Sequence, residues 1–312
     1  MHESLRYAAM TLNGTPEFRP LTGLYEPSAI QQLPDGRFLV LEDEKAHPFS
    51  LVTIGPDGAV SATPLRQKPP DLPKLNDLEG IALDRSGHVY AITSHSRNGD
   101  GDEKSSRERL VRFCIEGDRA LAPRVSKALK PALLAAHPVL AAAAEIRDVK
   151  DAGGLNVEAL DLTPDAQRLL IGFRSPLLGK RALVACVENP AAIFESGEAP
   201  RISATLEKLD LGGNGIRGMS YFPGLDGYLL IGGPVAREPV QFHLWFWSGR
   251  SGTPARRVTI SGLSGLERAE GVCPATIHGR QRIMIVSDDG NRKEGRFARF
   301  LLLDPGQLRI AT

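Results

Sequence analysis

The phrase EALDLTPDAQRLLIGFRSP, residues 158–176, decides the fold because variants of it recur along the chain. A polar or charged residue leads into an apolar strand, a turn rich in Pro, Asp and Gly follows, and a second apolar strand ends near charged residues. The other copies begin at Glu26, Glu79, Arg217 and Glu270. The starts lie about 50 to 80 residues apart, a spacing typical of repeat arrays and propellers.

Each copy continues into two further strands. After the copy at Glu26, for example, come SLVTIG, the turn PDG and AVSATPL, so each unit predicts four antiparallel strands. Strands such as RFLVLE (37–42) and RLLIGF (168–173) do not alternate polar and apolar residues, which indicates burial on both faces. Four-stranded sheets stacked around an axis satisfy this. We therefore predict an all-β fold, a five-bladed β-propeller over residues 1–312 as one domain, with six blades as the alternative.

Ring closure is expected to involve the two ends of the chain. The last unit ends in LRIAT (308–312), which is a weak fourth strand. The segment LRYAAMTL (5–12) is therefore expected to pair with the last blade and complete it.

One segment interrupts the repeat. Residues 126–150, SKALKPALLAAHPVLAAAAEIRDVK, are rich in Ala and Leu and predict a helical insert broken at Pro131 and Pro138. The insert lies between the second and third blades, on the face where the innermost strands start. Two interpretations remain open: a lid over the central opening, or a helical decoration packed on the rim.

Composition narrows the class of protein. The formal net charge is +1 without a cluster of Lys and Arg, which argues against nucleic-acid binding. No apolar stretch reaches membrane-spanning length, and the first residues lack the pattern of a signal peptide, so a cytoplasmic location is expected. The three cysteines have no C-x-x-C spacing, which indicates core residues rather than a zinc site or disulfides. A small molecule is therefore the expected partner, and the sequence leaves the oligomeric state open.

The geometry of a blade predicts where the polar residues meet. The start of the innermost strand and the end of the second strand converge at one mouth of the channel, so the five residues that begin the repeats should form a ring. The strand ends add further polar residues to the same mouth: Asp43, Glu44, His95, Arg97, Arg174, Asp288, Asp289 and Arg292. A concave mouth with convergent polar groups is the expected site.

The charges of this mouth allow three interpretations. Crowded carboxylates need a counter-charge, and a hard cation such as Ca²⁺ or Mg²⁺ held by Glu79, Glu158, Glu270 and Asp288 would supply it. The arginines could instead bind an anionic substrate group. The acids and arginines could also neutralise one another in a structural network that plugs the channel.

Several phrases resemble a bacterial family of unknown function: NDLEGIAL, GLNVEALDLTPDAQRLLIGFRSP, GIRGMSYFP and RAEGVCP. The E-G phrase at strand starts is also similar to phytase-like esterase, gluconolactonase/paraoxonase and calcium-activated nucleotidase propellers. The resemblance implies a metal held by carboxylates and amides at the channel mouth. Glu79, Asn156, Glu158 and Glu270 match that placement, whereas Arg174 and Arg217 have no counterpart there.

Two hypotheses follow. The first is a metal-assisted hydrolase of a small ester, lactone or phosphoester, in which a cation polarises the scissile group. Arg174 and Arg217 would steady an anionic substrate group, and His95 would transfer the proton. The second is a non-catalytic propeller that binds a small ligand or protein loop, with the charged ring as a structural network.

Overall fold

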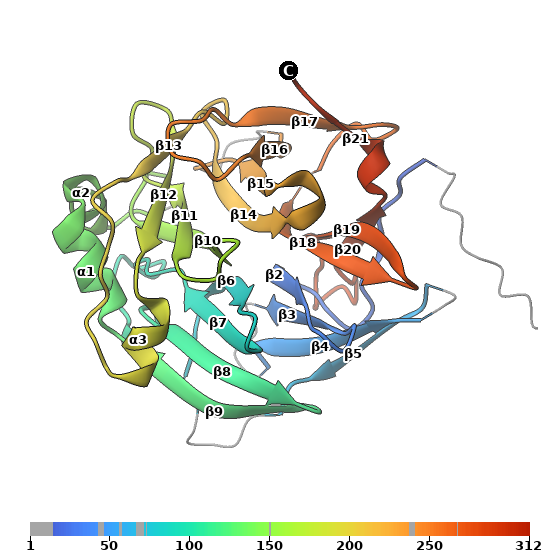
Figure 1. Ribbon diagram of the computed structural model, residues 1–312, viewed down its shortest axis with the longest axis horizontal. Coiled ribbons are helices and arrows are strands. Elements are labelled where there is room, and N and C mark those ends of the chain that lie inside the picture. The colour runs from blue at the N-terminus through green and yellow to red at the C-terminus, as the bar shows by residue number, and fades with distance from the viewer. Residues whose placement is uncertain are drawn as a thin grey trace, which may run out of the picture.

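The structure is a computed structural model that describes residues 15–42, 47–55, 58–66, 72, 74–149, 151–236, 241–266 and 268–312. The strands form five antiparallel sheets around one axis, as the blades of a propeller (Figure 1). The predicted all-β, five-bladed propeller is confirmed, and the described residues form no sixth sheet.

In each blade the first three strands run outward from the axis in chain order. The innermost strands are β2 (Pro27–Gln32), β6 (Leu78–Leu83), β10 (Asn156–Leu162), β14 (Gly215–Phe222) and β18 (Ala269–Ile277). The second strands are β3 (Phe38–Glu42), β7 (His88–Thr93), β11 (Leu169–Ser175), β15 (Gly227–Gly233) and β19 (Arg280–Ser287). The third strands are β4 (Phe49–Ile54), β8 (Leu110–Glu116), β12 (Ala182–Val187), β16 (His243–Trp247) and β20 (Arg299–Leu303).

The remaining elements lie at the outside of the blades or between them. The outer strands are β5 (Val60–Pro64), β9 (Arg119–Ser126), β13 (Glu207–Leu209), β17 (Arg256–Ile260), β1 (Arg19–Pro20) and β21 (Leu308–Ile310). The α-helices are α1 (Leu129–Ala136), α2 (Pro138–Ala144) and α3 (Pro190–Glu195). Short 3₁₀ helices span Ser105–Arg107, Pro223–Leu225 and Pro305–Gln307.

Closure of the ring uses other segments than expected. An N-terminal strand does complete the last blade, but it is β1, which pairs with β20; residues 5–12 lie outside the described residues. The C-terminal strand β21 pairs with β17 of the fourth blade, so the expectation that 308–312 form the fourth strand of the last blade is wrong. Because β1 occupies the free edge of β20, the chain after Pro305–Gln307 finds its partner on the neighbouring blade.

Burial on both faces of the blades is confirmed. All seven residues of β10 and of β15 are buried. The core consists of five apolar clusters, each between two adjacent blades, so every sheet is covered on both sides. This explains why the strands do not alternate polar and apolar residues.

Each innermost strand carries a β-bulge at the position that faces the axis. The unpaired residues are Ser28, Glu79, Glu158, Arg217 and Glu270. A bulge re-aims one side chain out of the regular pleat. The repeat in the first blade is therefore displaced by two residues from its expected register: Ser28, not Glu26, is the equivalent of the other four.

The residue after the bulge packs against the next innermost strand. A Cβ on Gly80 would lie 2.8 Å from the backbone nitrogen of Leu160, and one on Gly218 would collide with the carbonyl oxygen of Glu270. This close approach is why glycine follows the ring residue in the E-G phrase. One residue further, apolar side chains close the channel below the ring: Ile30, Ile81, Leu160, Met219 and Val272. The mouth is therefore a pocket with an apolar floor.

The helical insert forms α1 and α2, with Pro131 and Pro138 in their first turns. The helices lie at the periphery of the propeller (Figure 1). Leu129, Leu133 and Leu140 pack into the core cluster between the second and third blades. The helices are therefore a rim element, and none of the helices among the described residues has the length and apolar character needed to cross a bilayer.

We expect Gly218→Ala to lower the free energy of unfolding by about 3 kcal/mol, because the added methyl group forces β14 away from β18. Gly224→Ala is the matched control, since nothing lies within 4 Å of its Cβ position, and we expect a change within about 0.5 kcal/mol. Urea denaturation followed by circular dichroism measures both. Equal stability of the two variants would contradict the close packing at the ring.

Candidate functional site

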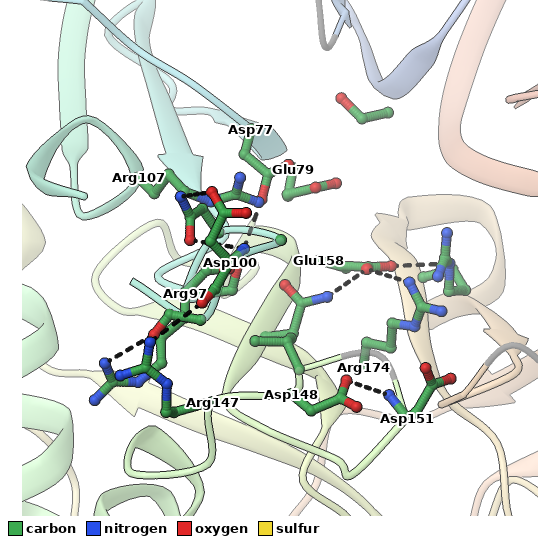
Figure 2. A pocket seen from close by; sticks show the side chains of 18 of the residues that line it. Asp77, Glu79, Arg97, Asp100, Arg107, Arg147, Asp148, Asp151, Glu158 and Arg174 are labelled. Atoms are coloured by element: carbon green, nitrogen blue, oxygen red, sulfur yellow. Dashed lines mark hydrogen bonds and ion pairs between the residues drawn. The ribbon is translucent and has the colours of Figure 1, made fainter. Parts of the chain in front are cut away.

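The pocket at the channel mouth has a volume of about 680 Å³. Its inner end is formed by the innermost strands at the bulges. Its walls come from the loop after β7 and from the segment after α2, which contributes Arg147, Asp148, Val149 and Asp151. Figure 2 shows these two wall segments together with Glu79, Glu158 and Arg174. The end of the insert, rather than its helices, thus contributes to the mouth.

The lining is acidic although the chain is not. Among the described residues, nine carboxylates and five guanidinium groups line the pocket, whereas the formal net charge of the whole chain is +1. The described lining therefore holds more acidic than basic side chains, unlike the chain as a whole.

Three carboxylates meet at the inner end. Glu79, Glu158 and Glu270 each offer one oxygen atom, and these atoms all lie within 4.8 Å of one another. They come from β6, β10 and β18, so residues almost 200 positions apart in the sequence are brought together only by closure of the ring. We call these three residues the glutamate trio.

Arg217 forms ion pairs with two of the three glutamates of the trio. Its Nε lies 2.8 Å from Glu158 Oε2, in an ion pair whose angle is poor for a hydrogen bond. Its Nη2 donates to Glu270 Oε1. The side chain is only 9% exposed. Arg217 therefore neutralises part of the charge of the two buried carboxylates, Glu158 and Glu270.

Glu158 has two further partners. Arg174 Nη1 lies 3.1 Å from Glu158 Oε1, and Asn156 Nδ2 donates to the same oxygen at 2.8 Å. Arg174 also donates through Nε to the carbonyl oxygens of Pro234 and Val235. Arg174 and Arg217 therefore both bind glutamates of the trio.

Burial sets the protonation of the trio. Burial raises the pKa of Glu79 well above its ordinary value, and the charges of Asp77, Glu158 and Glu270 raise it further. Burial also raises the pKa of Glu270, to about 8, although Arg217 opposes the shift. Burial alone would lower the pKa of Arg217, but Glu158 and Glu270 raise it overall, so the guanidinium stays charged.

Asp288 lies on the pocket wall outside the trio. Burial raises the pKa of its carboxyl to about 6, and the nearby charge of Glu26 adds to the shift while Arg217 and Arg268 oppose it. Asp288 was expected to bind a metal together with the three glutamates, but its carboxyl does not belong to their group. This carboxyl can exchange protons near neutral pH.

His95 does not line the pocket. The residue is 1% exposed, its Nδ1 lies 2.9 Å from the carbonyl oxygen of Thr93, and burial lowers its pKa to about 4. The backbone of His95 adopts a positive φ of 55° after β7. This placement does not support the expected proton-transfer role, because the imidazole faces the core rather than the pocket.

The other residues expected at the mouth divide into three groups. The lining includes Glu26 and Arg97. Asp289 is instead buried in an ion pair with Arg299, and Arg292 stacks 4.3 Å from the ring centre of Tyr25. Asp43 and Glu44 lie outside the described residues.

Several lining residues escaped the sequence analysis, among them Asp77, Asp100, Arg107, Arg147, Asp148 and Asp151. One signal could have found Asp77: it stands two residues before the bulge residue Glu79, as Glu26 stands before Ser28 and Asn156 before Glu158. The residues of the two wall loops have no such spacing. Arg107 forms an ion pair with Asp77 (Figure 2).

No family model matches the sequence, and no curated protein matches it. An exo-β-1,3-galactanase from Phanerochaete chrysosporium has a similar structure, with 10% identity and a TM-score of 0.52 over 95% of this chain and 66% of that one. The PQQ-bound aldose sugar dehydrogenase from Streptomyces coelicolor is 17% identical, with a TM-score of 0.43 over 92% and 98% of the two chains. A putative oxidoreductase (glucose dehydrogenase) from Thermus thermophilus is 17% identical, with a TM-score of 0.45 over 92% and 100%. At these identities the galactanase shows a shared fold and nothing about activity.

We expect Arg217→Met to lower the free energy of unfolding by about 3 to 5 kcal/mol at pH 8, because it leaves Glu158 and Glu270 buried without their shared cation. Arg147→Met is the control. It removes a lining arginine whose side chain is 68% exposed, and its effect should stay within about 0.5 kcal/mol. Chemical denaturation of both variants in the presence of a chelator tests this prediction. If Arg217→Met leaves the free energy of unfolding unchanged, the trio is solvated and the prediction is wrong.

The stability of the wild-type protein should depend on pH through Glu270. Its pKa is about 8 in the folded state against 4.5 for an ordinary glutamate, so the folded state prefers the neutral carboxyl. The stability that this preference contributes is complete below about pH 4.5 and is lost as the pH rises to about 8. We expect Glu270→Gln to remove this decline. The free energy of unfolding of both proteins is measured by chemical denaturation from pH 5 to 9. If it falls with pH by the same amount in both proteins, the prediction is contradicted.

Proposed function

We propose that the pocket is the active site of a hydrolase that uses a hard divalent cation to cleave a small ester or lactone. The observation that carries the proposal is the glutamate trio, three carboxylate oxygens within 4.8 Å of one another at the inner end of a pocket. Carboxylate oxygens at this spacing suit Ca²⁺ or Mg²⁺, which bind oxygen ligands.

A fourth oxygen supports the cation. Asn156 is 7% exposed, its Nδ2 donates to Glu158, and its Oδ1 is buried without a hydrogen-bond partner. A buried acceptor without a donor is costly unless something else satisfies it. Glu79, Glu158, Glu270 and Asn156 would thus hold the cation, which when bound would polarise the substrate carbonyl and acidify a water molecule.

The protein's own residues prepare this chemistry in different ways. Arg174 and Arg217 fix the orientation of Glu158 and Glu270, so we assign them positioning roles and not the expected contact with an anionic substrate group. Proton transfer falls to Asp288 instead of His95, because its carboxyl lies on the pocket wall with a pKa of about 6. Because every arginine in the described lining already has a partner, we do not include a phosphoester in the proposal.

The activities of the similar structures fit this pocket less well. No aromatic side chain lines it among the described residues, so a sugar ring would find no flat apolar surface to stack on. PQQ carries several carboxylates of its own and would meet an acidic lining. Neither the galactanase nor the dehydrogenase activity is therefore our proposal for this chain.

One observation favours a second function. Arg217 already pairs with two glutamates of the trio, as a purely structural network would require. In that case the pocket binds a small ligand without turnover, and no metal takes part. Metal dependence separates the two functions.

We expect millimolar Ca²⁺ or Mg²⁺ to raise the melting temperature of the wild-type protein, because a ligand at 100 times its Kd stabilises by about 2.7 kcal/mol. Glu79→Gln should abolish the shift, since it removes one of three carboxylates from the trio. Glu26→Gln changes an exposed lining carboxylate outside the trio and should retain it. Hydrolysis of simple esters and lactones should be lost with chelator and restored by the cation. A melting temperature that neither cation changes would instead support the structural network.

A further inference from the structure

We infer that the substrate of this pocket carries a primary ammonium or guanidinium group, which carboxylates at the outer part of the pocket, Glu26, Asp148 and Asp151, receive. The inference rests on the proposed function, because it assigns the charge class of the substrate at the same site. It depends on the partners of the lining arginines, on the unpaired acids and on the side chains that the lining lacks.

Every lining arginine among the described residues already has an acceptor. Arg174 and Arg217 hold the trio, and Arg107 holds Asp77. Arg97 donates to the carbonyl oxygens of Ala144 and Gly101. Arg147 donates to the carbonyl oxygen of Asp100 and lies 3.5 Å from Asp102 Oδ1. An anionic substrate would therefore have to break an existing contact to gain an arginine.

The carboxylates at the outer part of the pocket, Glu26, Asp148 and Asp151, in contrast, form no ion pair with a described residue. All three are exposed and line the pocket. Figure 2 shows Asp148 and Asp151 side by side after the insert, where the Asp151 backbone N–H donates to Asp148 Oδ1 at 3.0 Å. Glu26 approaches from the start of the first blade. A cation entering the mouth meets carboxylates from the segment after α2 and from the start of the first blade.

The inner cation does not cancel this charge. With the trio ionised around the cation, the nine carboxylates and five arginines of the described lining leave four negative charges in excess, and a divalent ion leaves two. A cleft lined by one sign of charge focuses the field and concentrates counter-ions. The field acts locally, because the whole chain carries a net charge of only +1.

Two features of the lining narrow the kind of cation. Quaternary ammonium groups donate no hydrogen bonds and are bound by aromatic cages, and the described lining contains no Phe, Tyr or Trp. Carboxylates accept hydrogen bonds, and the outer lining offers those of Glu26, Asp148 and Asp151. An N–H-bearing cation matches this lining.

The test compares four unreactive amides by calorimetry in the presence of Mg²⁺ or Ca²⁺: 4-aminobutanamide, its trimethylammonium analogue, butanamide and succinamate. We expect the primary ammonium compound to bind at least tenfold more tightly than the other three, and its affinity to fall as the salt concentration rises from 50 to 500 mM. Equal affinities, or tighter binding of succinamate, would overturn the inference.

Variants locate the contact. Asp148→Asn combined with Asp151→Asn should weaken binding of 4-aminobutanamide about tenfold and leave butanamide unchanged. The control removes the same charge elsewhere: Glu116→Gln with Glu188→Gln changes two exposed acids outside the lining and should not affect either ligand. If both double variants weaken the ammonium compound equally, net charge rather than the pocket acts, and the inference fails.

Turnover separates this inference from the proposed function. Methyl 4-aminobutanoate, methyl butanoate and monomethyl succinate differ in charge at the same chain length, and acid release reports their hydrolysis. Selective binding of 4-aminobutanamide without hydrolysis of any ester would uphold the charge class and contradict the hydrolase. Hydrolysis of all three esters at equal kcat/KM would uphold the hydrolase and overturn the charge class, as would failure of 4-aminobutanamide to bind.

Discussion

The ion pairs of Arg217 with Glu158 and Glu270 are the interaction on which the mouth depends. The three crowded glutamates at the inner end of the pocket, two of them buried, would repel one another and resist ionisation. Arg217 occupies the equivalent position of the fourth blade, where a fourth glutamate would have worsened the crowding. The arginine at this one position of the repeat thus pairs with two of the glutamates and lowers the crowding of like charges.

A β-bulge that occurs in the innermost strand of all five blades positions these side chains. At each innermost strand a bulge re-aims one residue toward the axis, a small residue follows where the next strand packs closely, and an apolar residue closes the floor. The sequence of the repeat is constrained at the last two positions by packing. The first position is free to vary, because its side chain enters a pocket, and it is Ser28 in one blade and Arg217 in another.

The helical insert contributes to the pocket through its contacts rather than as a cover. Lys130 of α1, although nearly buried, binds Glu103 and Glu108, and Arg97 reaches the carbonyl oxygen at the end of α2. These contacts hold the loop after β7, which forms one wall. The segment after α2 then supplies Asp148 and Asp151. The insert therefore supports one wall and provides the acids of another, while its Leu side chains secure it in the core between two blades.

Sequence alone determined the blades, because strand, turn and burial patterns are local and repeat five times. It also placed Glu79, Glu158, Arg217 and Glu270 together, since equivalent positions of a closed ring must converge.

Tertiary structure decided what the residues do there. Only the bulge register shows that Ser28 replaces Glu26 in the ring, only packing turns His95 toward the core, and only the partners of Arg174 and Arg217 show that they hold glutamates. The wall acids Asp148 and Asp151 follow from how the insert docks, which is a long-range contact that no local pattern encodes. Side-chain direction and ion pairing depend on atoms distant in sequence, and these become neighbours only when the ring closes.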